Sequence, residues 1–148
     1  MFETEIAALQ RFCTLLEREQ QMLGKGEIDA LLQLVQEKNE LAAALAAVAK
    51  QRAEALAAEG LAADRAGVVA WLAAHPSARR ARTDWSLLLS LATRARELNR
   101  VNGELIQLRM QHNALALEAL LGTTNPLGLY GSDGQSSLPS GHRISDRA

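Results

Sequence analysis

Aromatic residues are scarce in this chain. They make up 3% of the 148 residues, whereas 48% of the residues are hydrophobic, most of them Leu and Ala. Leu and Ala are strong helix formers, and the β-branched and aromatic residues that favour strands are few. The composition therefore predicts an all-α protein, and a chain of this length forms one modest domain that is elongated if it is helical.

Cysteine is nearly absent as well. Cys13 is the single cysteine, which excludes an intramolecular disulfide and a metal site built from cysteines. The histidines, His75, His112 and His142, are widely scattered, and none has a cysteine or carboxylate at ligand spacing. No Ser/His/Asp set, paired catalytic carboxylates or phosphate-binding glycine loop can be assembled either. We therefore expect no enzyme activity, no metal and no cofactor.

The chain also lacks a concentrated charge of one sign. Its net charge is −1, which disfavours the basic face that nucleic-acid binding needs. The densest basic cluster is Arg79, Arg80 and Arg82, and we interpret it as a solvated helix start with an Arg80–Asp84 pair. A nucleic-acid-binding helix centred on this cluster is the alternative, and it would require salt-dependent binding.

No hydrophobic run suits a membrane span or a signal peptide. The uncharged stretch from Gly67 to Ala78 is too short to cross a bilayer and contains Pro76. The first six residues are acidic and lack the positive region of a signal peptide. A soluble cytoplasmic protein is expected, with no membrane insertion.

Apolar spacing predicts a pair of antiparallel helices in the first part of the chain. The first runs from about Glu3 to Leu23 and ends at Gly24-Lys25-Gly26, where two glycines permit a reversal. The second runs from near Glu27 to about Ala58. The apolar seam of the first helix follows a 4-3-4-3 spacing through Phe2, Ile6, Leu9, Cys13, Leu16, Gln20 and Leu23.

The second helix carries two adjacent apolar rows, which predicts that it contacts two partners and favours a three-helix arrangement. Lys38 and Arg52 interrupt the row of large residues, and we interpret their stems as packed with the charges reaching its edge. The row of large residues is Leu31, Leu34, Lys38, Leu41, Leu45, Val48, Arg52 and Ala55. The row of small residues is Ile28, Leu32, Val35, Asn39, Ala42, Ala46, Ala49, Ala53 and Leu56.

Two further helices are expected, one short and one long. Asp64 is a candidate cap for the short helix, which His75-Pro76 ends. The last helix begins near Ser77 and ends at Leu121. Its predicted core seam is Leu87, Leu91, Arg94, Leu98, Val101, Leu105, Leu108, His112, Leu115 and Ala119. A second row runs beside it through Trp85, Leu88, Ala92, Ala95, Asn99, Asn102, Ile106, Arg109, Asn113, Ala116 and Leu120.

The domain organisation follows from these helices. Residues 1–121 are predicted to form an elongated antiparallel bundle of three long helices and one short helix. Residues 122–148 are rich in Gly and Ser, and we expect them to form a flexible tail, because they cannot bury enough apolar surface to offset the entropy of ordering.

Short motifs along the chain resemble the FlgN family of flagellar type III export chaperones. One is Glu97-Leu98-Asn99-x-x-Asn102-Gly103-x-Leu105-Ile106 with the trailing Arg109-Met110. Others are Leu129-Tyr130-Gly131-x-Asp133-Gly134-Gln135 after the last helix and Leu23-Gly24-x-Gly26-Glu27-Ile28-Asp29-x-Leu31 in the first reversal. The resemblance extends over nearly the whole chain, with the motifs in the same order.

This resemblance implies a cytosolic chaperone that is not an enzyme and needs no nucleotide. Its partners would be the amphipathic C-terminal helices of hook–filament junction proteins, which it keeps unassembled and hands to the cytosolic domain of the export gate. The resemblance also implies that the segment with Tyr130 docks on that gate. A pure chaperone of this kind should be a monomer or weak homodimer. The alternative is a structural coiled-coil protein or adaptor that self-associates into a tight oligomer.

The second row of the last helix is the predicted site for the client helix. Ile106 and Met110 would form its apolar floor, and Asn102 and Arg109 would orient the guest. Gly103 costs helix stability, which indicates close approach of another backbone, either the client's or the protein's own. The Asn residues admit a second interpretation, as polar residues that set the register inside the bundle. The complete predicted client site is Asn99, Asn102, Gly103, Ile106, Arg109, Met110 and Asn113.

Overall fold

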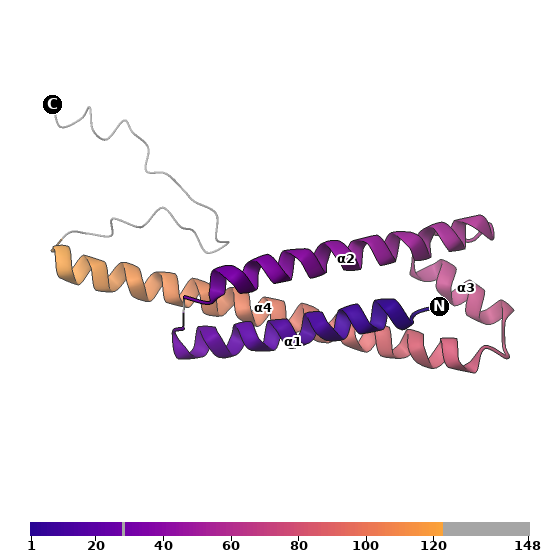
Figure 1. The fold of residues 1–148 in the computed structure, drawn as a ribbon, viewed down its shortest axis with the longest axis horizontal. Helices are drawn as coiled ribbons and strands as arrows, with labels where there is room; N and C mark the ends of the chain where they lie inside the picture. Colours follow the sequence, from indigo (N-terminus) through magenta and orange to yellow (C-terminus); the bar gives the residue numbers. More distant parts are fainter. Residues whose placement is uncertain (28, 123–148) are drawn as a thin grey trace, which may run out of the picture. The chain divides into compact units, whose positions relative to one another are not determined.

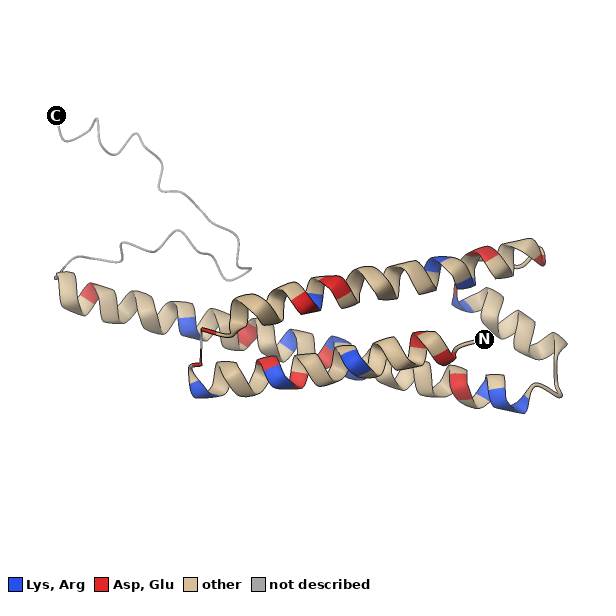
Figure 2. Cartoon of the chain, viewed as in Figure 1, with Lys and Arg blue, Asp and Glu red and all other residues tan. Residues whose placement is uncertain are grey.

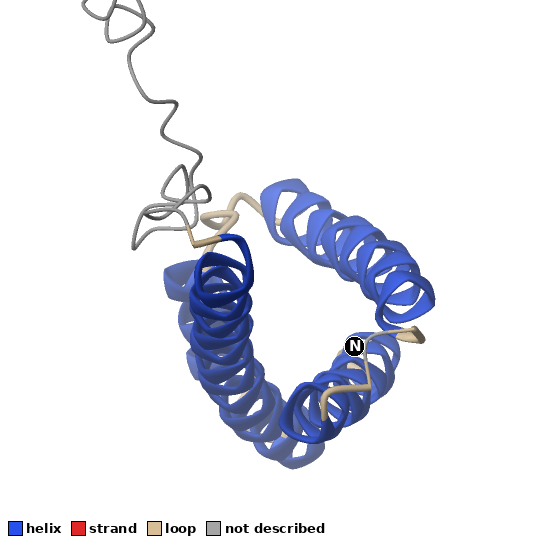
Figure 3. Cartoon of the chain, turned by 90° about the vertical axis from the view of Figure 1, so that its left-hand side faces the viewer, coloured by secondary structure: helices blue, strands red, loops and turns tan. Residues whose placement is uncertain are grey.

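The structure is a computed structural model that describes residues 1–27 and 29–122. These residues form four helices. In chain order they are α1 (Glu3–Lys25), α2 (Leu31–Ala58), α3 (Arg65–Ala74) and α4 (Arg79–Leu121) (Figure 1). No strand occurs within these ranges, as the view in Figure 3 also shows. The all-α prediction, with three long helices and one short one, is confirmed. Apart from Gly122, the predicted tail lies outside the described residues.

The reversal between α1 and α2 begins at the glycine that the sequence indicates. Gly26 has a φ of +73°, and its backbone N–H bonds to the carbonyl of Leu23. The N–H of Glu27 reaches back to the carbonyl of Met22 at 3.0 Å, so the end of α1 is closed by a Schellman motif. Because Glu27 belongs to this closure, α2 begins at Leu31, four residues later than predicted.

The short helix α3 has the cap and the end that the sequence predicts. Asp64 is extended, and its side chain accepts a hydrogen bond from the backbone N–H of Gly67 at 3.3 Å. A Cβ at Gly67 would lie 1.7 Å from the carbonyl oxygen of Ala62, so glycine is required there by the closeness of the preceding loop. The helix ends at His75, whose N–H bonds back to Trp71 and Leu72. Trp71 stacks on the His75 ring with centroids 4.2 Å apart and is half-buried against the core.

Contacts along the chain define two compact units, Met1–Asn102 and Gly103–Ala148, of which the second is described as far as Gly122. In the first unit, α1 packs against both α2 and α4. Leu16 and Phe2 are fully buried, and the Phe2 ring lies 5.4 Å from the ring of Trp85 on α4. The core cluster comprises Phe2, Ile6, Leu9, Cys13, Leu16, Leu56, Val68, Leu72, Trp85, Leu88 and Ala95.

Cys13 occupies the apolar seam of α1, as predicted. It is 4% exposed, and its Sγ lies 3.6 Å from the carbonyl oxygen of Leu91. Burial raises the pKa of the Cys13 thiol, because the thiolate would lose its hydration. The side chain therefore acts as a small hydrophobic residue between α1 and α4.

The face of α4 that packs in the first unit differs from the predicted core seam. All four buried residues of α4, Trp85, Leu88, Ala95 and Asn102, belong to the row that was predicted to lie beside the core. Of the predicted seam, Leu91 and Leu98 are half-buried against the core, whereas Leu87, Leu108 and Leu115 are 41%, 60% and 64% exposed. The physical reason is that small residues such as Ala95 let α1 approach this face of α4 closely. The predicted seam was identified from its large aliphatic residues, which do not indicate which face another helix can approach.

The row of small residues on α2 also differs from its prediction. Leu56 at its end is buried, but Leu32 and Val35 at its start are 81% and 43% exposed. Ala42 and Ala46 are exposed as well. The row of large residues provides the contact of α2 with α1, so the expected second partner of α2 is absent along the first half of this helix.

Candidate functional site

A buried polar layer connects three helices at the end of the first unit. Asn102 of α4 is 1% exposed, and its side-chain nitrogen Nδ2 donates to the carbonyl of Leu16 and to Oε1 of Glu19, both at 2.8 Å. Glu19 of α1 is 2% exposed and also accepts a hydrogen bond from Nζ of Lys38 on α2, at 3.4 Å. Oδ1 of Asn102 is buried and receives no hydrogen bond from the described residues. The layer therefore fixes α2 and α4 to one carboxylate of α1.

A second polar layer lies farther along α1. Arg52 of α2 forms an ion pair with Glu5 of α1, which is 8% exposed. The Arg52 guanidinium also lies over the Trp85 ring of α4, 5.5 Å from its centroid. Each layer therefore joins a carboxylate of α1 to a cation of α2 and a side chain of α4.

The two layers set the antiparallel register of α1 and α2. Glu5 and Glu19 are fourteen residues apart, and so are their partners Arg52 and Lys38. Any shift of one helix along the other would separate both pairs at once and leave buried charges without partners, which is strongly unfavourable. The sequence interpretation of Lys38 and Arg52 recognised their packing but missed these carboxylates. The equal spacing on the two helices is the signal that would have found them.

The predicted client site is divided by the structure. Asn102 is buried and hydrogen-bonded within the first unit, so for this residue the register-setting interpretation is the one the structure supports. Asn99, Gly103 and Asn113 are exposed, and Arg109 is half-buried. Ile106 and Met110 are 41% and 38% exposed. Tyr130, the predicted export-gate contact, lies outside the described residues.

The helical segment from Gly103 to Leu121 presents apolar side chains on its surface. Its exposed large hydrophobic residues are Ile106, Leu108, Met110, Leu115, Leu120 and Leu121. Ile106, Met110, Asn113 and Leu120 follow one another at spacings of four, three and seven residues, which places them on one face of a helix. Leu108 and Leu115 lie on the opposite face. A helix segment with this much exposed apolar surface is typical of a docking element.

Gly103 has no packing reason within the described residues. A Cβ built at this position meets no atom within 4 Å. Within the described residues, no backbone approaches Gly103 closely enough to require a glycine. A glycine inside a helix destabilises it by about 1 kcal/mol relative to alanine, so its presence indicates a requirement that the isolated chain does not reveal.

Replacing Gly103 with alanine is expected to raise the free energy of unfolding by about 0.5–1 kcal/mol, because the new methyl group has open space and alanine favours the helix. Urea denaturation followed by circular dichroism measures the change. The matched control is Gly122→Ala, at a φ of +65° that alanine adopts unfavourably. A Gly103→Ala protein less stable than wild type would show that this position is strained or contacted.

The described residues hold no group of three His, Cys, Asp or Glu side chains that could bind a metal ion. Among the described helices, no stretch combines the length and the apolar character needed to traverse a bilayer.

Comparison with family models gives a match over most of the chain. The model of the family described as FlgN protein matches residues 1–137, which includes every described helix and continues past Tyr130. No curated protein and no solved structure matches the chain. The match extends over more than nine-tenths of the sequence and therefore includes both the polar layers and the apolar segment of α4.

Proposed function

The chain belongs to the FlgN family of flagellar export chaperones, and from this membership we propose that its clients are the C-terminal helices of hook–filament junction proteins. In this proposal the protein acts in the cytoplasm, where it keeps these subunits from assembling prematurely and delivers them to the type III export gate. It acts as a monomer or weak homodimer and catalyses no reaction.

The observation that carries this proposal is the apolar face of the α4 segment after Asn102. Ile106 and Met110 are exposed there at a spacing of four residues, as required for contact with the apolar face of a guest helix. Met110 adds an adaptable thioether, which suits a surface that accepts more than one client sequence. Masking the guest's apolar face in this way would prevent its contact with other subunits.

Polar residues beside this face would orient the guest. Arg109 and Asn113 follow Ile106 on the same side of the helix and can donate to carboxylates or carbonyls of a client. Gly103 has open space around it and would let the guest backbone approach α4 closely. Asn102 acts indirectly in this proposal, because its hydrogen bonds to Leu16 and Glu19 hold α4 just before the client-binding segment.

Titration calorimetry tests the proposal with the full chain and peptides comprising about the last 40 residues of each junction protein, a length comparable to one or two helical hairpins. We expect sub-micromolar binding with a negative heat-capacity change, because apolar surface is buried. Folded protein that binds neither peptide, and that elutes as a tight oligomer on its own, would contradict the chaperone role and favour a self-associating coiled coil.

Replacing Tyr130 with alanine is expected to reduce binding to the cytosolic domain of the export gate by at least about tenfold, because buried aromatic anchors dominate many interfaces. Client affinity should not change. Pull-down on the purified gate domain and secretion of junction proteins in a flagellated host measure the two effects, and Leu138→Ala in the same region is the control. Normal gate binding and normal secretion by the Tyr130→Ala protein would exclude this docking role.

A further inference from the structure

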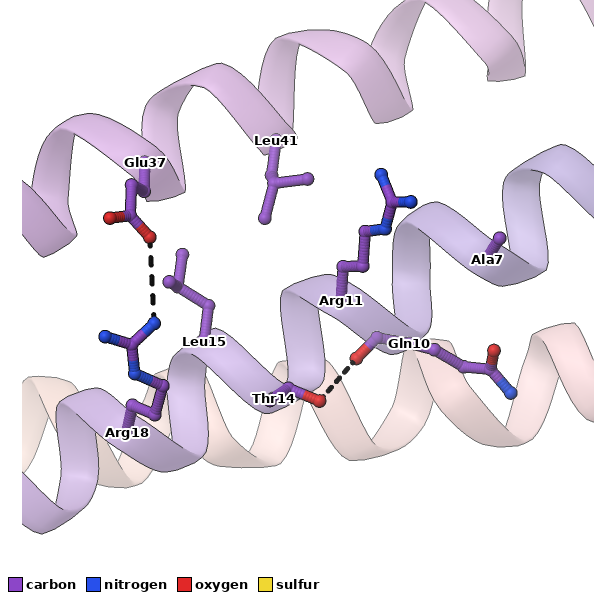
Figure 4. Close-up of a pocket in the computed structure, with 8 residues that line it drawn as sticks. All are labelled: Ala7, Gln10, Arg11, Thr14, Leu15, Arg18, Glu37 and Leu41. Carbon is purple, nitrogen blue, oxygen red and sulfur yellow. Dashed lines mark hydrogen bonds and ion pairs between the residues drawn. The ribbon is translucent and has the colours of Figure 1, made fainter.

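A groove of about 470 Å³ lies between α1 and α2, and no residue of the two polar layers lines it. Leu15 of α1 and Leu41 of α2 project toward each other across it, and Arg11 and Arg18 rise from α1 on either side of Leu15 (Figure 4). Leu15 is 4% exposed and forms the floor. The remaining residues that line the groove are Ala7, Gln10, Thr14 and Glu37. The groove therefore combines an aliphatic floor with guanidinium groups at its rim.

The two arginines have different surroundings. Arg18 forms an ion pair with Glu37 of α2, with Nη1 and Oε2 3.8 Å apart (Figure 4). Arg11 lies seven residues before Arg18, on the same face of α1, but it has no hydrogen bond or ion pair with any described residue. Among the described residues, Arg18 therefore has a carboxylate partner and Arg11 does not.

The register of α1 and α2 explains this difference. In an antiparallel pair of helices, a residue seven positions earlier on α1 faces a residue seven positions later on α2. The ion pairs of the two polar layers show that α1 and α2 keep this register over fourteen residues. The step from the Arg18–Glu37 pair leads to Arg11 and Ala44. Alanine thus occupies the position where a carboxylate would pair with Arg11.

Ala44 belongs to an uncharged part of α2. No Asp, Glu, Lys or Arg occurs between Glu40 and Lys50, and Figure 2 shows this stretch without charged residues. Ala44 is itself exposed, so a longer side chain would have space there. The wall of the groove opposite Arg11 is consequently apolar, and the guanidinium lies beside it with its donors available.

We propose that this groove is a second protein-binding surface, and that it takes an acidic helical segment of a partner through a carboxylate on Arg11 and an aliphatic side chain against Leu41. A guanidinium presents paired donors that match both oxygens of a carboxylate. The half-buried Leu41 favours a peptide over a free anion, because a peptide can cover the apolar surface of Leu41 and a free anion cannot. The surface lies within the first unit and is independent of the client-binding residues proposed on α4.

The probe for this surface is a labelled alanine-based helical peptide of about 15 residues, with one Glu and one Leu four positions apart. Its affinity is measured by fluorescence anisotropy, and the Nε–Hε resonance of Arg11, assigned with the Arg11→Gln protein, locates the contact. We expect the peptide to shift this resonance. A peptide with Gln in place of Glu should bind about fivefold more weakly, as for the loss of an ion pair at the surface.

The decisive variant is Ala44→Glu, which supplies the missing carboxylate from within the chain. It should reduce binding of the Glu peptide about fivefold, as should Arg11→Gln. The matched control is Ala43→Glu, which adds the same charge to the same helix one residue away, where the side chain points elsewhere, and it should change affinity less than twofold. Unchanged affinity in the Ala44→Glu protein, or no shift of the Arg11 resonance at millimolar peptide, would overturn the proposal.

Binding of the junction-protein peptides separates this inference from the proposed function. Ala44→Glu and Arg11→Gln should both leave client affinity unchanged. An equal loss of client affinity in both variants would show that the groove belongs to the client site, which would overturn its assignment as an independent surface. If Ala44→Glu and Arg11→Gln weakened binding of the acidic peptide only, the groove would be supported as an independent surface. This support would hold even if the wild-type protein bound neither junction-protein peptide.

Discussion

Replacing Glu19 with alanine is expected to lower the free energy of unfolding by about 3–5 kcal/mol, the range for removing one partner of a buried ion pair. The substitution removes the acceptor that the Lys38 ammonium and the Asn102 amide share. Lys38, whose side chain is 24% exposed, would lose its ion pair, and the buried Asn102 amide would keep only its hydrogen bond to the Leu16 carbonyl. Urea denaturation followed by the helical circular dichroism signal measures the loss.

The matched control is Glu17→Ala on the same helix. Glu17 also forms an ion pair, with Arg94 of α4, but the side chains of Glu17 and Arg94 are 38% and 61% exposed. A solvent-exposed pair contributes at most about 1 kcal/mol. If Glu19→Ala destabilised the protein no more than Glu17→Ala, Glu19 would not be the buried anchor that its contacts indicate.

A triple replacement of Glu19, Lys38 and Asn102 by leucine separates the contribution of the polar layer to folding stability from its contribution to the register of the helices. Apolar residues of similar volume can restore or exceed the stability of a buried polar group, because no charge has to be desolvated. We expect the triple variant to be more stable than Glu19→Ala but to have broader amide NMR signals, because the polar layer no longer selects one register. Sharp, wild-type-like spectra would assign the register to apolar packing alone.

Replacing Ile106 with aspartate is expected to weaken client binding by at least about 30-fold, which corresponds to the loss of a residue worth 2 kcal/mol or more at the centre of an interface. The charge would lie within the apolar contact and lose its hydration there. Because Ile106 is 41% exposed in the absence of client, the free energy of unfolding should change far less than the client affinity. Calorimetry with the junction-protein peptides, together with urea denaturation, measures both quantities.

Leu108→Asp is the control for this experiment. Leu108 is 60% exposed and lies on the opposite face of the same helical segment, so the chemistry and the helix are kept while the face changes. The control should retain most of the client affinity. Equal losses in the two variants would indicate that the helix itself, rather than the face with Ile106 and Met110, is what the client requires.

Asn102→Ala is expected to affect stability more than client affinity, unlike Ile106→Asp. The Asn102 amide donates two hydrogen bonds within the core, so the main effect of the substitution should be on stability, with a change in client affinity only through the position of α4. A combined Asn102→Ala and Ile106→Asp protein would therefore mix two effects. Only the single variants separate the anchor from the contact.

Local signals in the sequence predicted the helices well. Gly26 ends α1 and Asp64 caps α3 because left-handed closure and side-chain capping depend on residues within one turn. The face of α4 that packs was not predicted, because Leu87 and Leu108 are as hydrophobic as residues that are buried. Only the approach of α1, which Ala95 permits, decides between the two rows.

The polar residues of the site were harder to interpret than its apolar ones. An asparagine on an amphipathic helix is compatible with a core position and with a surface, and Asn102 differs from Asn99 in facing the Leu16 carbonyl and the carboxylate of Glu19. That carboxylate comes from a residue 83 positions away in the chain. Pairing over such distances depends on register, which single-helix periodicity does not contain.

The last buried residue of α4 is Asn102, and no residue from Gly103 to Leu121 is buried. Packing within the first unit therefore constrains the residues of α4 up to Asn102. Substitutions after Gly103 have little native packing to disrupt, so under the proposed function the client-binding residues could change while the protein stays folded. One continuous helix thus contains a mutationally constrained half and an evolvable half.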